Sequence, residues 1–362
     1  MTDMLESDAE AARRVERTYR STRQVAEMLR GYVVTQFIAV AVRSGIPDHL
    51  GETAVADDRL AELTGLGVGE LRRFMRALEG LGLVERVSPV ERAGTSGYRA
   101  TALAAPLRRG GALYGLAQLA GGEYYQAWAG LDRALRTGES AFEHQHGRSL
   151  WTLLNGSTDA AASFARSMRT NTEHFLPDIL ALHDYSTTGV VADLGAGAGT
   201  LVTALLTHHP ALRAIAFEQP GVIEHTRRTI REHGLDDRCE LVAGDFLVDV
   251  PAGADLYVLQ SVLHNWDDDA ALRILGNCRT AMGAGTGADS RLLVIERAMQ
   301  PVDPLSAAIH DLTMLVLFGG QDRDVDGYRS LLERSGFAVV ATARGETGIC
   351  LLEARPAGQG RR

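Results

Sequence analysis

The chain of 362 residues contains no lysine, so all 37 residues of its Lys+Arg count are arginines. This absence excludes every reaction that needs a lysine amine. Schiff-base chemistry with pyridoxal or aldolase substrates, P-loop nucleotide hydrolysis and the protein-kinase mechanism all require one. An enzyme with this sequence has to work without a lysine amine.

Positive charge is also scarce. The 37 arginines face 46 aspartates and glutamates, which gives a formal net charge of −9. Proteins that bind nucleic acid depend on clustered cations that neutralise phosphates. We therefore expect no nucleic-acid partner, and a small or neutral molecule as the ligand.

Cysteine is rare and long apolar runs are missing. The three cysteines are odd in number and widely spaced: Cys239, Cys278 and Cys350. They indicate neither a disulfide framework nor a zinc–cysteine site, and His144 and His146 lack further ligands nearby, so we expect no metal. The polar start has no secretory core, and the apolar run 32–42 is too short to span a bilayer. The sequence predicts a cytoplasmic protein without a membrane partner.

The first part of the chain, residues 1–110, has a helical pattern followed by a hairpin. Segment 32–46 is apolar on nearly all sides, which is typical of a helix that faces another helix or another subunit. In segment 71–78, apolar residues recur with helical spacing. Two short strands at 83–87 and 98–101 then complete the outline of a winged helix, and a dimer interface is expected here.

The remainder divides again at about residue 182. Residues 111–182 read as helices that link the two ends of the molecule, and residues 183–362 alternate short strands with helices. The strands expected are 190–194, 213–218, 239–244, 255–260 and 291–296, followed by a closing pair at 337–343 and 349–354. Strands separated by helices imply right-handed βαβ units. The fold class expected is therefore α/β, a Rossmann-like parallel sheet with an antiparallel edge, preceded by a mainly α winged-helix domain.

Ionisable side chains stand at or just after the ends of the five parallel strands: Asp193, Glu218, Asp245, His264 and Glu296. In an open α/β sheet, ligands bind at the carboxyl ends of the strands. Helix capping could explain any one of these residues, but it explains the set poorly. We therefore expect the five side chains to point at one crevice.

The turn after the first of these strands is rich in glycine. Gly195, Gly197 and Gly199 follow one another at alternate positions, and Thr200 stands where a dinucleotide fingerprint has its third glycine. This weakens a nicotinamide interpretation. Glu218, nineteen residues after Gly199, is placed to accept both hydroxyl protons of a ribose. A nucleoside-bearing ligand fits.

Asp245 and Phe246 supply a further acceptor beside an aromatic face. An adenine ring needs this pair, because its exocyclic amine donates a hydrogen bond and its ring needs an apolar surface.

The most specific segment reads VLHNWDDD, residues 262–269. Together with DLGAGAG at 193–199 and DLTMLVLFGGQDR at 311–323, it resembles the class I S-adenosylmethionine-dependent O-methyltransferases of small-molecule metabolism, whose motif is close to VLHDW. These include the plant caffeate type and the bacterial polyketide-tailoring type. The resemblance covers nearly the whole chain. It implies a winged-helix dimerisation domain, a helical linker that contributes to the substrate pocket, a catalytic domain that binds S-adenosyl-L-methionine, and a homodimer.

The resemblance also implies roles for individual residues. His264 would be the general base, and Glu296 and Asp322 would orient its ring. Linker helices of this family close over the site, and Gly195 and Gly197 would pass near the methionine part of the cofactor. The cofactor-binding residues expected in this way are Asn171, Asp193, Gly195, Gly197, Glu218, Asp245, Phe246 and Gln260.

Five residues are expected at the acceptor: Trp128 and Met168 in the linker, Asn265 in the motif, and Met314 and Phe318 in the apolar segment near the end. Met314 and Phe318 could equally be plain core residues. Asn265 replaces the usual aspartate, Asp322 is shorter than the usual glutamate, and Gln260 stands where many relatives have lysine or arginine.

Other functions stay open at this point. A winged-helix transcription regulator would use Arg72, Arg73 and Arg76 on DNA, but Glu70 and Glu79 flank them. A dehydrogenase would bind NAD. Some members of the family use the cofactor for hydroxylation or rearrangement. His264 favours methyl transfer to a hydroxyl, expected on a small aromatic secondary metabolite, although nitrogen and carboxyl acceptors also fit.

Overall fold

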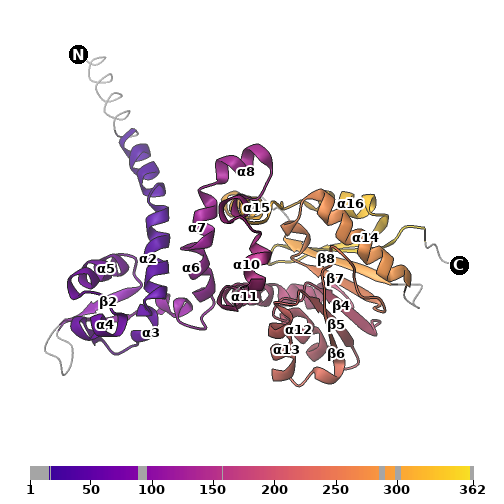
Figure 1. The fold of residues 1–362 in the computed structure, drawn as a ribbon, viewed down its shortest axis with the longest axis horizontal. Coiled ribbons are helices and arrows are strands. Elements are labelled where there is room, and N and C mark those ends of the chain that lie inside the picture. The colour runs from indigo at the N-terminus through magenta and orange to yellow at the C-terminus, as the bar shows by residue number, and fades with distance from the viewer. Residues whose placement is uncertain are drawn as a thin grey trace, which may run out of the picture. The chain divides into compact units, whose positions relative to one another are not determined.

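The computed structural model describes residues 16, 18–88, 96–156, 158–284, 290–297 and 303–358. The chain divides into two compact units, residues 1–121 and 122–362 (Figure 1). The helices expected to form a separate linker fall mostly in the second unit, together with the sheet. A linker with the bounds 111–182 stays a prediction.

The first unit contains the winged-helix outline. It comprises α2 (Gly31–Arg43), α3 (Ile46–His49), α4 (Asp57–Thr64), α5 (Val68–Gly80), η1 (Ala102–Leu107), α6 (Tyr114–Ala120) and an antiparallel sheet in the order β1 (Val55–Ala56), β3 (Gly97–Ala100), β2 (Val84–Val87). The apolar face predicted for segment 71–78 is confirmed, because Leu71, Met75 and Leu78 are buried in the core of this unit.

One helix in the described part of the chain is long and apolar enough to cross a membrane by length and composition alone. It spans Thr18–Arg43, and 17% of its most apolar window is buried within the structure. Its exposed apolar side chains include Tyr19, Val25 and Met28. A helix that packs against another protein chain passes the same test.

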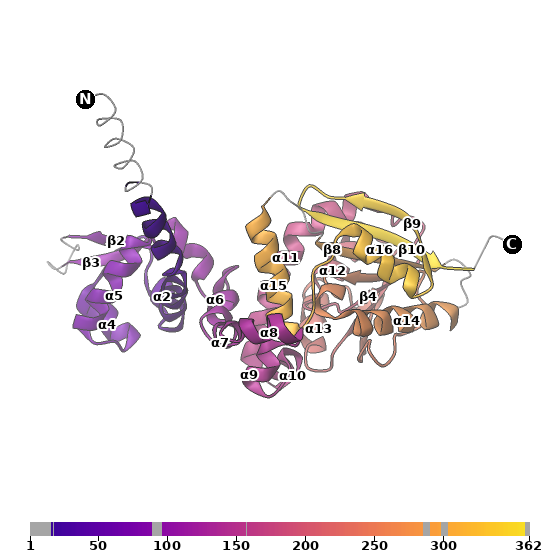
Figure 2. The same cartoon turned by 90° about the horizontal axis from the view of Figure 1, so that it is seen from above.

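The second unit begins with five helices: α7 (Glu123–Trp128), α8 (Leu131–Thr137), α9 (Ala141–His146), α10 (Leu150–Gly156) and α11 (Thr158–Leu182). A late helix, α15 (Pro304–Phe318), packs against α7, α8 and α9, as Figure 2 shows. Segments more than 150 residues apart thus share one small core, in which Phe142 and Leu317 are both buried.

The seven-stranded sheet has the order β6-β5-β4-β7-β8-β10-β9. Its strands are β4 (Val190–Leu194), β5 (Arg213–Glu218), β6 (Cys239–Ala243), β7 (Leu256–Gln260), β8 (Arg291–Arg297), β9 (Phe337–Arg344) and β10 (Ile349–Pro356). The first five are parallel, and β10 pairs antiparallel with both β8 and β9. The predicted fold class and antiparallel edge are confirmed.

Helices cover both faces of the sheet. On one face, α14 (Asp268–Ala284) and α16 (Val325–Arg334) enclose one apolar core, and on the other α11, α12 (Thr200–His208) and α13 (Ile223–Glu232) enclose a second. Because the inner strands β4, β5, β7 and β8 are buried on two faces, their side chains are apolar almost throughout, and their polar residues stand mainly at the strand ends. The edge strand β6 is less buried.

Candidate active site

A pocket opens at the carboxyl ends of β4, β5 and β7, beside α11. We call it the glycine-turn pocket, because the turn 195–198 forms one wall. Seven of the eight residues expected at the cofactor line it: Asn171, Asp193, Gly195, Gly197, Glu218, Phe246 and Gln260. The eighth, Asp245, lines a neighbouring pocket that shares Trp151, Gln219 and Trp266 with the first.

The turn after β4 brings bare backbone to the pocket. Gly195 and Gly197 have φ values of +84° and +56°, which side chains other than glycine rarely adopt. A Cβ at Gly195 would lie 3.1 Å from a methyl group of Val262. Gly195 is therefore favoured for both conformation and space, and Gly197 for conformation alone, because a Cβ there would meet nothing within 4 Å.

Two carboxylates lie in this pocket. Glu218 accepts hydrogen bonds from the backbone N–H of Gly197 (2.8 Å) and of Gln219 (2.7 Å). Burial raises the pKa of Glu218 and these two bonds oppose the rise. Burial and the charge of Glu218 raise the pKa of Asp193 to about 7. Oδ2 of Asp193 is buried and has no hydrogen-bond partner in the described part of the chain.

A row of aromatic rings forms the wall between the two pockets. The Phe246 ring lies edge-to-face to Trp266, with centroids 5.9 Å apart. Trp266 stacks on Trp151 at 6.2 Å, and Trp151 stacks on Phe318 at 5.0 Å. Trp151 on α10 was not predicted from the sequence, because it lies outside every motif and reaches the site only through the tertiary fold.

The turn after β7 carries His264 and is held tightly. Ser261 has a φ of 55°, the one positive value among the non-glycine residues that the structure describes. The side-chain amide of Asn265 donates to the carbonyl of Ser261 (3.2 Å), and Oε1 of Glu296 accepts the N–H groups of Val262 (3.0 Å) and Leu263 (2.7 Å). These bonds hold η3 (Leu263–Asn265) in one conformation.

His264 itself is buried, with its Nδ1 atom 2.7 Å from Oε2 of Glu296. This is an ion-pair contact that lacks the alignment of a good hydrogen bond. Burial lowers the pKa of His264, but the charge and proximity of Glu296, helped by the charge of Asp322, outweigh it, so the net pKa is raised. A neutral ring therefore needs a pH somewhat above the ordinary histidine value of ~6.5.

Asp322 lies near His264 but contacts a different histidine. Its Oδ2 atom is 2.5 Å from Nδ1 of His310. The His310 ring in turn lies edge-to-face to the His264 ring, with centroids 5.5 Å apart. The direct contact between Asp322 and His264 that the resemblance implied is not found among the described residues, because His310 takes the carboxylate.

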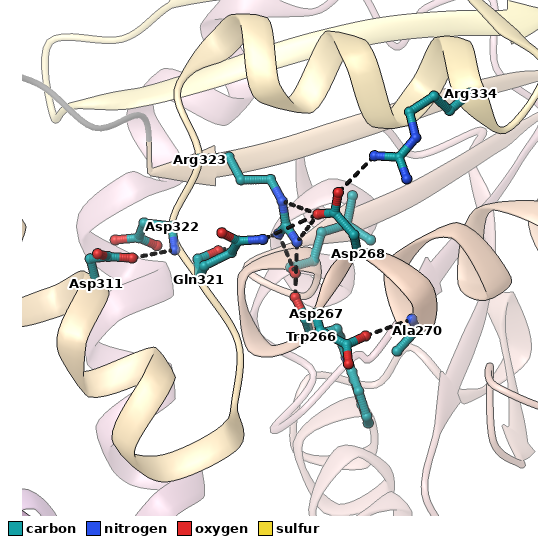
Figure 3. Close-up of polar contacts among 10 residues, drawn as sticks. Trp266, Asp267, Asp268, Ala270, Asp311, Gln321, Asp322, Arg323 and Arg334 are labelled. Atoms are coloured by element: carbon teal, nitrogen blue, oxygen red, sulfur yellow. Dashed lines mark hydrogen bonds and ion pairs between the residues drawn. The ribbon is translucent and has the colours of Figure 1, made fainter. Parts of the chain in front are cut away.

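Arg323 supports the same turn through several polar contacts, as Figure 3 shows. Its buried guanidinium donates to the carbonyls of Leu263 (3.1 Å) and Trp266 (3.0 Å) and to the carboxylate of Asp268 (2.8 Å). Arg334 binds the other oxygen of Asp268 at 2.7 Å. Arg323 was not predicted from the sequence, although it directly follows Asp322 in the segment GGQDR.

The five residues expected at the acceptor lie in three different places: the glycine-turn pocket, the neighbouring pocket and the protein interior. Met168 and Asn265 line the glycine-turn pocket, and Phe318 lines the neighbouring one. Met314 is buried, and Trp128 packs in the helical core with Phe142, so neither lines either pocket in the described structure. Gln260 accepts a hydrogen bond from Thr172 (3.2 Å) and donates one to Ser261 (2.6 Å). In the described residues, no group of His, Cys, Asp and Glu side chains could hold a metal ion.

Comparison with known proteins gives two family matches. Residues 128–338 match the O-methyltransferase domain, and residues 26–109 match the O-methyltransferase dimerisation domain. The chain belongs to the O-methyltransferase family. Its sequence and its fold place it among the class I S-adenosylmethionine-dependent members, as the motifs indicated.

The similarity to individual O-methyltransferases extends over almost the whole chain. The phenazine O-methyltransferase PhzM of Lysobacter antibioticus is 36% identical, over 91% of this chain and 95% of its own. The 3-amino-4-hydroxybenzoate 4-O-methyltransferase of Streptomyces cremeus is 37% identical, over 87% of this chain and 85% of its own. The solved structure of the mitomycin 7-O-methyltransferase MmcR superposes with a TM-score of 0.87 at 33% identity, over 95% of this chain and all (100%) of its own.

Proposed function

We propose that this methyltransferase acts on a phenolic hydroxyl of a small aromatic secondary metabolite, with His264 as the general base. The observation that carries the proposal is the buried His264–Glu296 pair at the carboxyl end of the sheet. The names of the relatives refer to a phenazine, an amino-hydroxybenzoate and a mitomycin. They support an aromatic ring, fused or with neighbouring polar substituents, as the acceptor.

The chemistry of the glycine-turn pocket fits S-adenosylmethionine. Two lone pairs of the Glu218 carboxylate are occupied by backbone N–H groups, which leaves others for a ribose diol. The buried, unpartnered oxygen of Asp193 suits a positively charged ligand. Arg169 is the one cationic side chain among the described lining residues, and it would hold a carboxylate. Phe246 and Trp266 would flank the adenine.

The reaction requires three contributions from the protein. S-adenosylmethionine supplies an electrophilic methyl group, so the protein has to orient the acceptor oxygen, exclude water and remove one proton. A phenol with a pKa of ~10 is mostly protonated at neutral pH. With Nδ1 held at Glu296, Nε2 of His264 would take the phenol proton, and Glu296 would stabilise the imidazolium that forms. Asp322 would add to this stabilisation through its charge.

We also propose a cytoplasmic homodimer that forms through residues 1–110. The match of residues 26–109 to a dimerisation domain and the exposed apolar side chains of the helix Thr18–Arg43 support this. A nucleic-acid or membrane partner is not part of the proposal. Arg72, in the one cationic cluster noted in the sequence, is engaged by Asp57 (2.7 Å) and Asp58 (3.6 Å).

A transfer assay tests the proposal. The protein is incubated with methyl-labelled S-adenosylmethionine and a panel of phenols, anilines and aromatic carboxylates, and products are identified by mass spectrometry. We expect labelled methyl ethers, lost in His264→Ala at unchanged cofactor affinity and retained in the exposed-histidine control His144→Ala. Labelled amines or esters would correct the acceptor class. A hydroxylated or rearranged product without label, or tighter binding of NAD, would contradict methyl transfer.

A further inference from the structure

A second histidine stands beside the proposed base and has its own carboxylate. His310 contacts Asp322 through Nδ1 at 2.5 Å, as His264 contacts Glu296 at 2.7 Å. The two rings meet edge-to-face at 85° with centroids 5.5 Å apart. The described site thus holds two histidine–carboxylate pairs in contact with each other.

The fold brings His310 to this place through α15, which packs against η3. The next residue of the helix, Asp311, accepts the backbone N–H of Asp322 at 2.9 Å. Two successive residues of α15 therefore bind Asp322. His310 contacts the carboxylate of Asp322, and the side chain of Asp311 accepts its backbone N–H. The side chain of Asp322 is only 2% exposed and that of His310 26%, so the contact is largely shielded from water.

Asp322 does not reach the base directly. One of its carboxylate oxygens is taken by His310, and the other, Oδ1, is buried without a hydrogen-bond partner in the described part of the chain. Its influence on His264 is limited to its charge, which helps to raise the pKa of that ring. The side-chain contact that links Asp322 to the base is therefore the His310 ring.

We propose that His310 is a positioning residue for methyl transfer: Asp322 fixes the His310 ring, and that ring holds His264 in the orientation that faces the acceptor. The proposal rests on the role of His264 as general base. The contact between Nδ1 and Glu296 lacks hydrogen-bond alignment, so by itself it does not fix the tilt of the His264 ring, and a second ring packed against it restricts this tilt. Misplacing a reacting group by ~1 Å can cost about 100-fold in rate, so the contact matters for turnover more than for binding.

Four variants test this assignment in the full-length protein. His310→Ala removes the ring, and we expect kcat to fall about 10- to 100-fold while the acceptor KM and the cofactor Kd change less than about threefold. His310→Phe keeps a ring against His264 but cannot bind Asp322, so it should retain more of kcat than His310→Ala. Asp322→Ala should lose kcat as His310→Ala does. The kcat of the double variant, which combines His310→Ala with Asp322→Ala, should lie no more than about threefold below that of either single variant, because the two residues act in series.

The outcomes separate this proposal from the proposed function. His264→Ala serves as the reference for loss of the base and His144→Ala as the exposed-histidine control. If His264→Ala is inactive and His310→Ala keeps kcat within twofold, the positioning role is overturned while the base assignment stands. Equal losses in His310→Phe and His310→Ala, or multiplicative losses in the double variant, also overturn it. If His310→Ala does not fold, the comparison of His310→Phe with Asp322→Ala decides. A kcat of His310→Phe below that of Asp322→Ala would count against the ring contact.

Discussion

One carboxylate holds both the proposed base and the turn that carries it: Oε2 of Glu296 lies 2.7 Å from Nδ1 of His264, and Oε1 accepts the N–H groups of Val262 and Leu263. Glu296 is itself completely buried in β8. Substitution of this residue therefore changes the charge beside the imidazole and the conformation of the turn at the same time.

Glu296→Gln should shift the acid limb of the kcat profile to lower pH. The pKa of His264 is raised because Glu296 and Asp322 outweigh burial and the charge of Arg297, which lower it. The base works as the neutral ring, so activity in the native protein should rise with pH through a midpoint above ~6.5. Without the carboxylate charge, burial prevails and the midpoint should fall. Turnover measured from pH 5 to 9 checks this, and an unmoved midpoint would show that another group controls the limb.

Arg323→Ala should destabilise the protein by about 3 kcal/mol, the upper end of the range for leaving a buried hydrogen-bonding group without its partner. The change leaves the carbonyls of Leu263 and Trp266 without their donor and removes one partner of Asp268. Arg334→Ala is the matched control, because it removes the exposed partner of the same carboxylate and should cost about 1 kcal/mol or less. Urea unfolding measures both. If both substitutions lower the free energy of unfolding equally, the buried hydrogen bonds of Arg323 contribute no more than the exposed ion pair of Arg334.

Gly320→Ala should reduce kcat about 10-fold or more and destabilise the fold by about 1–3 kcal/mol. A Cβ at this position would overlap the carbonyl oxygen of His264 and lie 2.5 Å from the carbonyl carbon of Asn265. The turn that carries the base would have to move. Gly276→Ala, within α14, meets no atom within 4 Å and should stabilise the protein slightly. Transfer kinetics and thermal unfolding of the pair decide, and wild-type kcat in Gly320→Ala would refute the close approach.

Asp193→Asn should change how stability depends on pH. The pKa of Asp193 is raised to about 7 in the fold, against an ordinary value of 3.8. A raised pKa means that the folded state holds the proton more tightly, so this stability is complete below about pH 4 and is lost as pH rises through about 7. Each tenfold difference in proton affinity between the folded and unfolded states is worth about 1.4 kcal/mol. The variant should lose this slope between pH 4 and 7, and the exposed control Asp237→Asn should keep it. If the free energy of unfolding depends on pH in the same way in Asp193→Asn and in the native protein, the raised pKa of Asp193 is contradicted.

Periodicity and strand ends carried much of the fold prediction. Strands β4 and β5 coincide with the segments expected from their apolar runs, because a strand buried on two faces leaves a continuous apolar signal. The same reasoning placed Asp193, Glu218 and His264 at the carboxyl edge of the sheet. The expectation that five side chains share one crevice was wrong, because Asp193 and Glu218 line the glycine-turn pocket, Asp245 lines the neighbouring one, and the buried His264 and Glu296 line neither. The insertion of β10 between β8 and β9 was not predictable, since two adjacent antiparallel strands can pair with a sheet in either order.

Contacts between distant segments were less accessible. The resemblance assigned Asp322 to His264, but the Asp322 carboxylate contacts His310, which comes from a helix with no motif signal at that position. Asp245 is adjacent in sequence to Phe246, yet its side chain lines the neighbouring pocket and accepts the N–H of Leu247 at 2.9 Å. Local spacing does not specify which way a loop side chain turns.

The chemistry that this protein can use follows from its residues without any knowledge of the fold. The absence of lysine excludes reactions that need its amine, and the strand ends supply carboxylates and one histidine for the chemistry that remains. How these groups are held became visible only in the folded chain. Glu296 binds the turn, Arg323 supports it, and His310 stands between Asp322 and the base. The contacts of Glu296 and Arg323 with the turn join segments 33 to 60 residues apart in sequence, and the contact between His310 and Asp322 joins α15 to the segment that follows it. They depend on packing distances that no local pattern of residues encodes.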